Sequence, residues 1–193
     1  KMAKIYRMKS KPLFFDRNQW LALPTKKELE EILLKEKIDI IHTIMPTIAS
    51  LRAIVVAKKL NLKIVAHSHT QPENFMPYIP KPLWTICRFL FYRYLVYFNK
   101  KANIVICPSE FSESLLKEQS PKLKTKVISN GVNTEKFKPL NKKENNLLKI
   151  LFVGRLDPEK EVPTLIYAFK ELTKSSNKIM LNIVGKGIGE KKI

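Results

Sequence analysis

Short apolar segments rich in β-branched residues alternate along the chain with longer segments of helical periodicity. Helices are expected to begin after the capping residues Thr47 and Ser109, and at Pro163, a residue type that favours the first turn. This alternation predicts an α/β fold of buried parallel strands joined by right-handed helical crossovers. The expected strands are IDIIH (38–42), KIVAH (63–67), NIVIC (103–107), KVIS (126–129), KILFV (149–153) and IMLNIV (179–184).

One polar stretch interrupts this rhythm. Residues 139–149, PLNKKENNLLK, are charged and follow a proline, after which the strand and helix pattern begins again. We therefore expect a nearly complete first domain over 1–146 and the beginning of a second over 147–193. The chain starts at Lys1 rather than at a methionine and stops soon after its last strand, so we expect it to be part of a larger two-domain protein.

The chain is strongly basic, with 36 Lys and Arg against 17 Asp and Glu and a formal charge of +19. Such a field attracts nucleic acid, anionic lipid or phosphorylated ligands. Lysine is spread along the whole sequence, and no basic run is interleaved with aromatic residues, so nucleic-acid binding is not expected. Cys87 and Cys107 have no CxxC spacing and are expected to be small buried residues in a reducing, cytoplasmic compartment.

An aromatic segment over 83–101, LWTICRFLFYRYLVYFNKK, is expected to be a helix. It is too short and too interrupted by Arg88 and Arg93 to span a membrane. It either packs on the sheet or lies in a membrane interface, and it could do both if one face of the helix contacted the sheet and another the membrane. The positive charge favours a peripheral protein on the inner face of the membrane. Helical spacing places one polar group near one face, Thr85, Arg88, Tyr92 and Asn99. The same spacing leaves a broad apolar surface, Trp84, Phe89, Phe91, Leu95 and Phe98.

A glycine and two cations follow the strand 149–153, at the end of a parallel sheet where ligands bind. Gly154 lets a ligand approach the backbone, Arg155 offers a planar fork to phosphate oxygens, and Lys160 adds a mobile cation. These three residues predict a diphosphate clamp. The alternative is a surface turn in which the cations pair with two neighbouring carboxylates, Asp157 and Glu159.

Two histidines, His67 and His69, flank the end of the strand 63–67. No further ligand follows at a metal-binding spacing, so no metal site is expected. Either ring faces a ligand, or it is a partly buried side chain that is satisfied by a backbone carbonyl.

Four segments, in order, resemble the motifs of family 4 glycosyltransferases. They are DIIHTIMP (39–46), VICPSEFSESLLKE (105–118), VISNGVNTEKFKP (127–139) and VGRLDPEK (153–160). The resemblance implies two Rossmann-like domains of the GT-B type, the first on the acceptor side and the second binding a nucleotide sugar. It also implies retaining, metal-independent transfer of a hexose from a UDP- or GDP-sugar to an acceptor, without a cofactor. The acceptor is expected to be a lipid or a saccharide, and the positive charge favours a lipid.

The resemblance also assigns roles to residues. It implies that Arg155 and Lys160, beside Gly154, contact the diphosphate and stabilise the charge that develops on the leaving group. In related enzymes a histidine after the strand that corresponds to 63–67 approaches the donor sugar. The segment HTQPENF favours His69 over His67 as that histidine. Two positions depart from the family pattern. Glu161 stands where a glycine is usual, so that its carboxylate competes for Lys160, and Lys186 stands where an acidic residue is common.

Two other interpretations remain. One is a non-catalytic module of the same fold that binds a sugar or a partner, since fold does not imply function. The other is a nucleotide-sugar epimerase or dehydrogenase, which is disfavoured because no GxGxxG motif follows a strand in this sequence. The glutamate pair that the family carries late in its second domain is not found here, and this chain alone is expected to be inactive.

Overall fold

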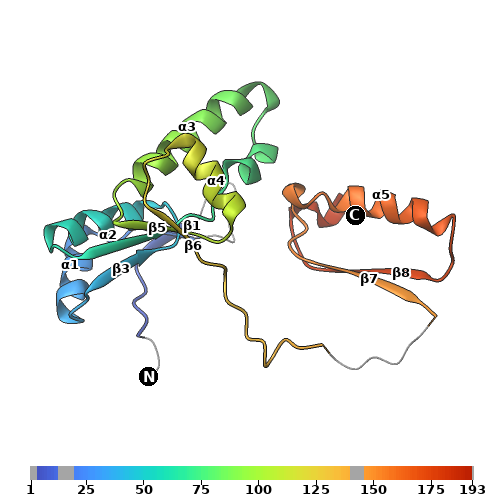
Figure 1. Ribbon diagram of the computed structural model, residues 1–193, viewed down its shortest axis with the longest axis horizontal. Coiled ribbons are helices and arrows are strands. Elements are labelled where there is room, and N and C mark those ends of the chain that lie inside the picture. The colour runs from blue at the N-terminus through green and yellow to red at the C-terminus, as the bar shows by residue number, and fades with distance from the viewer. Residues whose placement is uncertain (1–3, 13–19, 140–145, 193) are drawn as a thin grey trace. The chain divides into compact units, whose positions relative to one another are not determined.

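The computed structural model describes residues 4–12, 20–139 and 146–192 (Figure 1). The chain divides into two compact units. The first comprises Lys1–Pro72 and Lys81–Gly131, and the second comprises Glu73–Pro80 and Val132–Ile193. Residues 140–145, beside the expected domain boundary near residue 146, lie outside the described residues, and that boundary stays a prediction.

A parallel sheet of four strands forms the first unit, and the predicted α/β class is confirmed. Its strands follow chain order: β3 (Ile40–Thr43), β4 (Lys63–His67), β5 (Ile104–Cys107) and β6 (Thr125–Val127). The helices between them are α2 (Ile48–Lys59), α3 (Trp84–Asn99) and α4 (Glu110–Gln119). Thr47 and Ser109 cap α2 and α4 as predicted, because each hydroxyl accepts a hydrogen bond from the backbone N–H three residues later.

The core of this unit is built where the helices pack on the sheet. Phe98 of α3 is almost fully buried there, and hiding a side chain of this size contributes about 2 kcal/mol. Burial raises the pKa of the Cys107 thiol to about 11, whereas Cys87, also expected to be buried, is only half-buried. The other core residues come from α2, α4, β3 to β5 and the loop before β6: Ile54, Ala57, Leu116, Ile41, Ile64, Ala66, Val105 and Leu123.

The side chain of Asn103 continues the sheet where β5 begins. Its Oδ1 accepts a hydrogen bond from the backbone N–H of Ile64 at 2.7 Å, and its own backbone N–H donates to the carbonyl of Ile64 at 2.8 Å. A buried N–H without a partner would cost about 1–3 kcal/mol. Asn103 therefore fixes the pairing of β4 with β5.

Two elements near the N-terminus complete the first unit. A short antiparallel pair, β1 (Ser10–Pro12) and β2 (Trp20–Ala22), was not expected from the sequence. The helix α1 (Lys26–Lys35) follows, and the Thr25 hydroxyl accepts from the N–H of Glu28 at 3.2 Å while the Glu28 carboxylate accepts from the N–H of Thr25 at 2.7 Å. The two N–H bonds form a reciprocal capping box. The bond from the Thr25 N–H, with a second from the Thr25 hydroxyl at 2.9 Å, lowers the pKa of the Glu28 carboxyl.

The helix α3 is the predicted helix of the aromatic segment, and it follows two 3-10 turns, η1 (Pro72–Tyr78) and η2 (Lys81–Leu83). The expected division of its faces was wrong. Tyr92 and Asn99, placed on the polar face, are buried, whereas Trp84 and Phe89, placed on the apolar surface, are exposed. The reason is that only the C-terminal half of α3 packs in the core. No helix within the described residues is long and apolar enough to cross a membrane.

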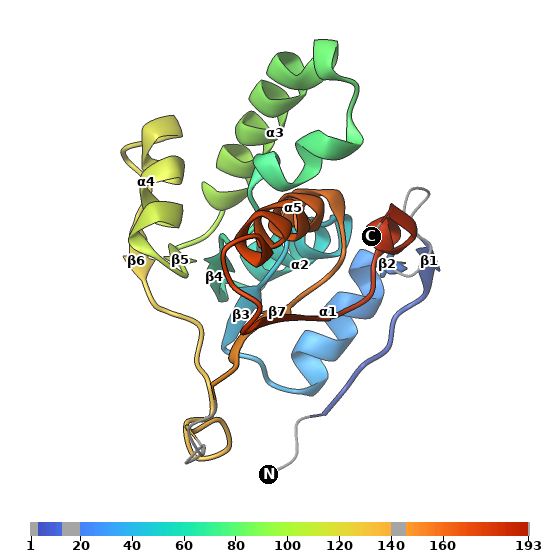
Figure 2. The same ribbon diagram turned by 90° about the vertical axis from the view of Figure 1, so that its right-hand side faces the viewer.

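The second unit contains a two-stranded parallel sheet, with α5 along one of its faces (Figures 1 and 2). The expectation that both strands are buried was wrong, because Val153 at the end of the first strand is 68% exposed and Val184 at the end of the second is 54% exposed. Parallel strands are buried on both faces only where helices cover both. The elements are β7 (Leu148–Val153), η3 (Pro158–Lys160), α5 (Val162–Thr173), β8 (Ile179–Val184) and η4 (Ile188–Lys192).

Glu161, immediately before α5, has a left-handed backbone, with φ 51° and ψ 34°. This conformation costs a residue with a side chain about 1–2 kcal/mol, and a glycine adopts it without that cost. The backbone thus gives a physical reason for the glycine that resembling sequences carry here. The Glu161 carboxylate accepts a hydrogen bond from the Thr164 hydroxyl at 3.1 Å.

We expect Glu161→Gly to raise the free energy of unfolding by roughly 0.5–1 kcal/mol, because relief of the left-handed backbone outweighs the loss of one exposed hydrogen bond. Urea denaturation of the protein measures this change. The control is Glu171→Gly, at a helical backbone position within α5, which should destabilise by about 1 kcal/mol. A Glu161→Gly variant that is destabilised like the control would contradict the expectation.

Candidate functional site

The loops that follow β7 and β8 are joined by backbone hydrogen bonds at the carboxyl end of the sheet. The N–H of Gly154 donates to the carbonyl of Val184 at 3.0 Å, and that of Leu156 donates to the carbonyl of Lys186 at 3.0 Å. The N–H of Gly189 returns a bond to the carbonyl of Leu156 at 2.7 Å. The pairing of the two strands therefore continues into the loops that carry the predicted clamp.

Glycines allow the loops after β7 and β8 to approach each other closely. A Cβ atom at Gly185 would lie 1.8 Å from the carbonyl oxygen of Gly154, and one at Gly187 would lie 2.5 Å from Oδ1 of Asp157. Contacts this short do not occur in folded proteins, so the two loops approach as they do only because both positions lack side chains.

Arg155 is paired with two carboxylates. Its guanidinium lies 3.0 Å from Oδ2 of Asp157 and donates to Oε1 of Glu159 at 2.6 Å. Both carboxylate side chains are only 7% exposed, whereas that of Arg155 is 58% exposed. Oδ1 of Asp157 also accepts from the N–H of Ile188 at 3.0 Å. Buried carboxylates thus hold an exposed guanidinium, as the surface-turn alternative anticipated for this residue.

Tyr78 contributes a residue that the sequence analysis missed. It belongs to the segment 73–80 of the second unit, and its hydroxyl donates to Oε2 of Glu159 at 2.9 Å. Burial and this bond to a carboxylate raise the pKa of Tyr78 to about 12. Glu159 is therefore held by both a phenol and a guanidinium. No local pattern in the sequence connects a tyrosine at 78 with residue 159.

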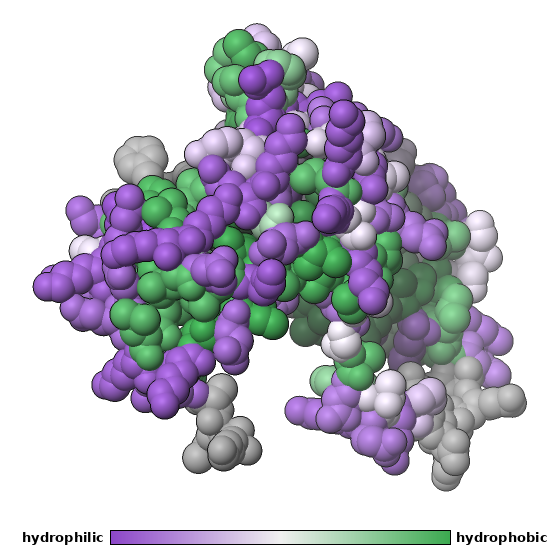
Figure 3. All heavy atoms as spheres, turned by 60° about the vertical axis from the view of Figure 1, so that its left-hand side comes forward, coloured by the Kyte–Doolittle hydropathy of each residue, from purple (hydrophilic) through white to green (hydrophobic). Residues whose placement is uncertain are grey.

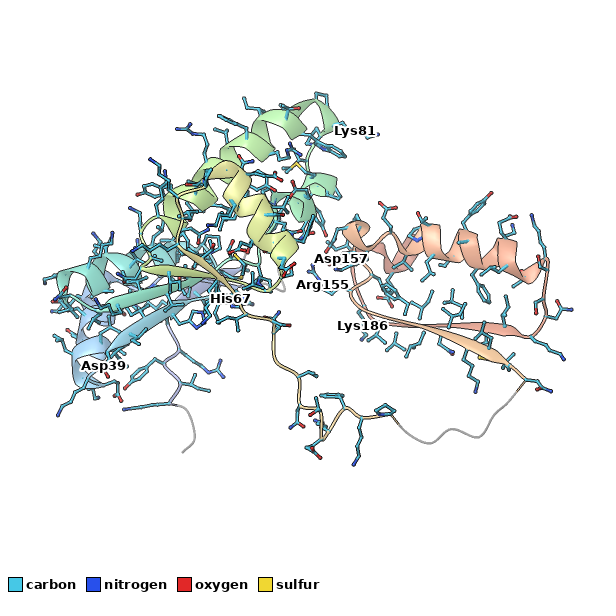
Figure 4. All side chains as sticks on the ribbon, in the orientation of Figure 1. Asp39, His67, Lys81, Arg155, Asp157 and Lys186 are labelled. Atoms are coloured by element: carbon cyan, nitrogen blue, oxygen red, sulfur yellow. The ribbon has the colours of Figure 1, made fainter. Side chains whose placement is uncertain are left out.

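Lys160 and Lys186 differ from Arg155 in having no carboxylate partner among the described residues. Lys160 and Lys186 are both exposed, and within the described residues neither side chain makes a hydrogen bond or an ion pair. The Glu161 carboxylate bonds to Thr164 rather than to Lys160. The loops after β7 and β8 therefore carry one oriented guanidinium and two ammonium groups that are available to an anion. Figure 4 labels two of these cations, Arg155 and Lys186.

The first unit gathers its three histidines at the carboxyl end of β3 and β4. His42 stacks on His67 with ring centroids 5.8 Å apart, and His69 meets His67 edge-on at 5.0 Å. His42 was not singled out from the sequence, although it lies near the end of a strand as His67 does. The carbonyl of Ser68 accepts from the Ser112 hydroxyl at 3.0 Å, which fixes the chain just before the more accessible His69.

The surroundings of His67 disfavour its protonated form. Burial, followed by the charges of His69 and His42, lowers the pKa of His67 below its usual value. Its Nε2 is buried and has no hydrogen-bond partner among the described residues. In the same residues no group of three or more His, Cys, Asp or Glu side chains is placed to hold a metal ion. His67 suits a supporting position, and His69, which follows the strand end, suits contact with a ligand.

An apolar surface, here called the α3 patch, surrounds the beginning of α3. Figure 3 shows hydrophobic side chains gathered on the surface among hydrophilic ones. Basic side chains lie along the same helix and just after it, where Arg93 lies 5.6 Å from the ring of Phe89 and Lys101 4.0 Å from that of Tyr97. The patch consists of five exposed residues, Leu83, Trp84, Ile86, Phe89 and Leu90.

Three curated relatives match the chain, and each is longer than it. It is 29% identical to the alpha-monoglucosyldiacylglycerol synthase of Streptococcus pneumoniae, over 95% of this chain and 44% of that protein. It is 23% identical to the sulfoquinovosyl transferase SQD2 of Arabidopsis thaliana, over 84% and 34%. It is 25% identical to the lipopolysaccharide 1,2-N-acetylglucosaminetransferase of Salmonella typhimurium, over 78% and 35%. The chain thus spans less than half the length of these relatives.

Two solved structures share the fold. Sucrose-phosphate synthase from Thermosynechococcus elongatus matches with a TM-score of 0.62 at 20% identity, over 83% of this chain and 40% of that one. A point mutant of TarM from S. aureus, in complex with fondaparinux, alpha-GlcNAc-glycerol and UDP, matches with a TM-score of 0.63 at 19% identity, over 90% and 34%.

Two family models cover the chain between them. Residues 132–193 match the model described as glycosyl transferases group 1, and residues 2–136 match that described as Glycosyltransferase Family 4. The chain therefore belongs to glycosyltransferase family 4.

Proposed function

We propose that this protein transfers a hexose from a nucleoside diphosphate sugar to a membrane lipid, with retention of the anomeric configuration. The observation that carries the proposal is the cation group at the end of the β7–β8 sheet, where two buried carboxylates orient Arg155. Glycine loops at the carboxyl ends of parallel strands are where such folds bind ligands.

The main role of this site would be to stabilise the negative charge that develops on the leaving group. Breaking the bond between sugar and phosphate leaves negative charge on the diphosphate, and oriented cations stabilise that charge without further reorganisation. A guanidinium has five N–H donors, so Arg155 retains donors for phosphate while it contacts Asp157 and Glu159. Lys160 supplies a second, mobile cation. These two residues would carry the transition-state stabilisation, with Gly154 leaving room for the phosphate.

His69 is the second part of the proposal. Its ring lies just beyond the end of β4, and the backbone before it is fixed by Ser112. We assign it to the donor sugar, where an imidazole contributes hydrogen bonding or proton transfer. His67, whose Nε2 is buried, would orient the ring of His69 through their edge-on contact.

The lipid acceptor is supported by the α3 patch and by the relative that is an alpha-monoglucosyldiacylglycerol synthase. Exposed aromatic and aliphatic side chains beside basic groups suit the interface of an anionic membrane. The formal charge of +19 adds a long-range attraction to such a surface. We therefore propose that α3 holds the protein on the membrane that contains its acceptor.

Lys160→Gln should lower turnover roughly a hundredfold, because one stabilising donor is lost in the transition state. The full-length protein is screened for release of UDP, GDP or ADP from the corresponding sugars, with and without diacylglycerol. The control is Lys170→Gln, which removes the same charge from a position on α5. If the unaltered protein binds a nucleotide sugar but never turns it over, the binding-module alternative replaces the enzyme proposal.

His69→Ala should reduce turnover at least about a hundredfold while leaving the thermal unfolding midpoint nearly unchanged, because the ring lies outside the buried core and contributes to chemistry instead. Steady-state kinetics with the donor found in the screen measures the effect. His42→Ala, which removes a ring from the same edge, is the matched control and should change turnover only a few-fold. Near-normal turnover of His69→Ala would remove this residue from the site.

A Phe89→Ser, Leu90→Ser double variant should bind phosphatidylglycerol vesicles at least about tenfold more weakly, because two exposed apolar side chains no longer enter the interface. Vesicle co-sedimentation at several salt concentrations measures this binding, which should fall with salt and be weak on phosphatidylcholine. Leu172→Ser removes a similarly exposed leucine from α5 and should have no effect. Equal binding of all three proteins would contradict membrane docking through α3.

A further inference from the structure

Lys186 lies beside Arg155 at the end of the β7–β8 sheet. The two strands pair Val153 with Val184, and the hydrogen bonds of the Gly154 and Leu156 N–H groups carry this register past the strand ends. Counting two residues on from the last strand pair sets Lys186 opposite Arg155. Figure 4 shows both residues leaving the same end of this sheet.

The backbone of Lys186 is fixed more firmly than that of an ordinary surface lysine. Gly185 and Gly187, on either side of it, contact the neighbouring loop too closely to tolerate a Cβ atom. The Lys186 carbonyl accepts the N–H of Leu156 at 3.0 Å. A side chain on a fixed backbone loses less entropy when it binds a ligand, because only its own rotamers remain to be ordered.

The three cations at this end of the sheet differ in their ion pairs. Arg155 is matched by Asp157 and Glu159, whereas Lys186 and Lys160 have no carboxylate partner among the described residues. The Lys186 ammonium therefore keeps its donors for a ligand, and an anion that accepts from it gains a charge-assisted hydrogen bond. The site therefore favours an anionic ligand.

We propose that Lys186 is a further diphosphate-binding residue, which donates from Nζ to a phosphate oxygen of the nucleoside diphosphate. This inference rests on the function proposed above and extends it to a position where resembling sequences commonly carry an acidic residue. A lipid phosphate shares this chemistry, and the experiment separates the two sources.

The experiment is isothermal titration calorimetry of the full-length protein with UDP, GDP and ADP and with the corresponding nucleosides. Lys186→Gln should weaken binding of the preferred diphosphate roughly tenfold, the loss of one charge-assisted hydrogen bond, and leave nucleoside binding unchanged. The binding should also depend less steeply on salt. Lys186→Arg should restore most of the affinity.

Lys178→Gln is the matched control. Lys178 precedes β8 at the opposite, amino end of the same strand, so this variant has the same net charge as Lys186→Gln. Its diphosphate affinity should equal that of the unaltered protein. Vesicle binding should be the same for both variants, which assigns the contact to the nucleotide rather than to a lipid phosphate.

Two results would overturn the inference in different ways. If Lys186→Gln binds the diphosphate as tightly as the unaltered protein, or if Lys178→Gln weakens binding equally, Lys186 makes no specific contact. The proposed function stands in both cases. If the unaltered protein binds no nucleoside diphosphate, the proposed function fails and the role of Lys186 fails with it.

Discussion

The close approach of two loops at the carboxyl end of the β7–β8 sheet is the constraint on which the candidate site depends. Gly185 and Gly187 allow that approach, because a Cβ atom at either position would overlap the backbone or the carboxylate of the neighbouring loop. The approach in turn places the N–H of Ile188 on the carboxylate of Asp157, which pairs with Arg155. A clash at either glycine would therefore disturb the cation that the proposed chemistry uses, although neither glycine contacts that cation directly.

Electrostatics follows from this geometry. Asp157 and Glu159 are buried and hold the guanidinium of Arg155, while Lys160 and Lys186 remain without partners in the described part of the chain. The same residues thus satisfy the surface-turn alternative for Arg155 and leave cations for a phosphate. Arg155 can pair with carboxylates and still bind an anion. A guanidinium that is already oriented loses less conformational entropy on binding than a free one.

Local signals in the sequence were sufficient for much of the fold. The strand 63–67 and the caps at Thr47 and Ser109 depend on neighbouring residues, and the structure confirms them. Features set by distant residues were missed. Helical spacing alone could not show that only the second half of α3 enters the core, or that Tyr78 bonds to Glu159. The position of His42 in the histidine group follows from strand register, which no single segment contains.

Hydrogen exchange on nucleotide binding is the most direct test of the central claim that the joined loops of the second unit form a diphosphate site. The account predicts that UDP, or whichever diphosphate binds, slows exchange in the segments 154–161 and 185–190. The corresponding nucleoside should slow exchange there much less, because it lacks the phosphates that these loops would contact. The account would be contradicted if the diphosphate slowed exchange elsewhere in the protein but left the exchange rates of both segments unchanged.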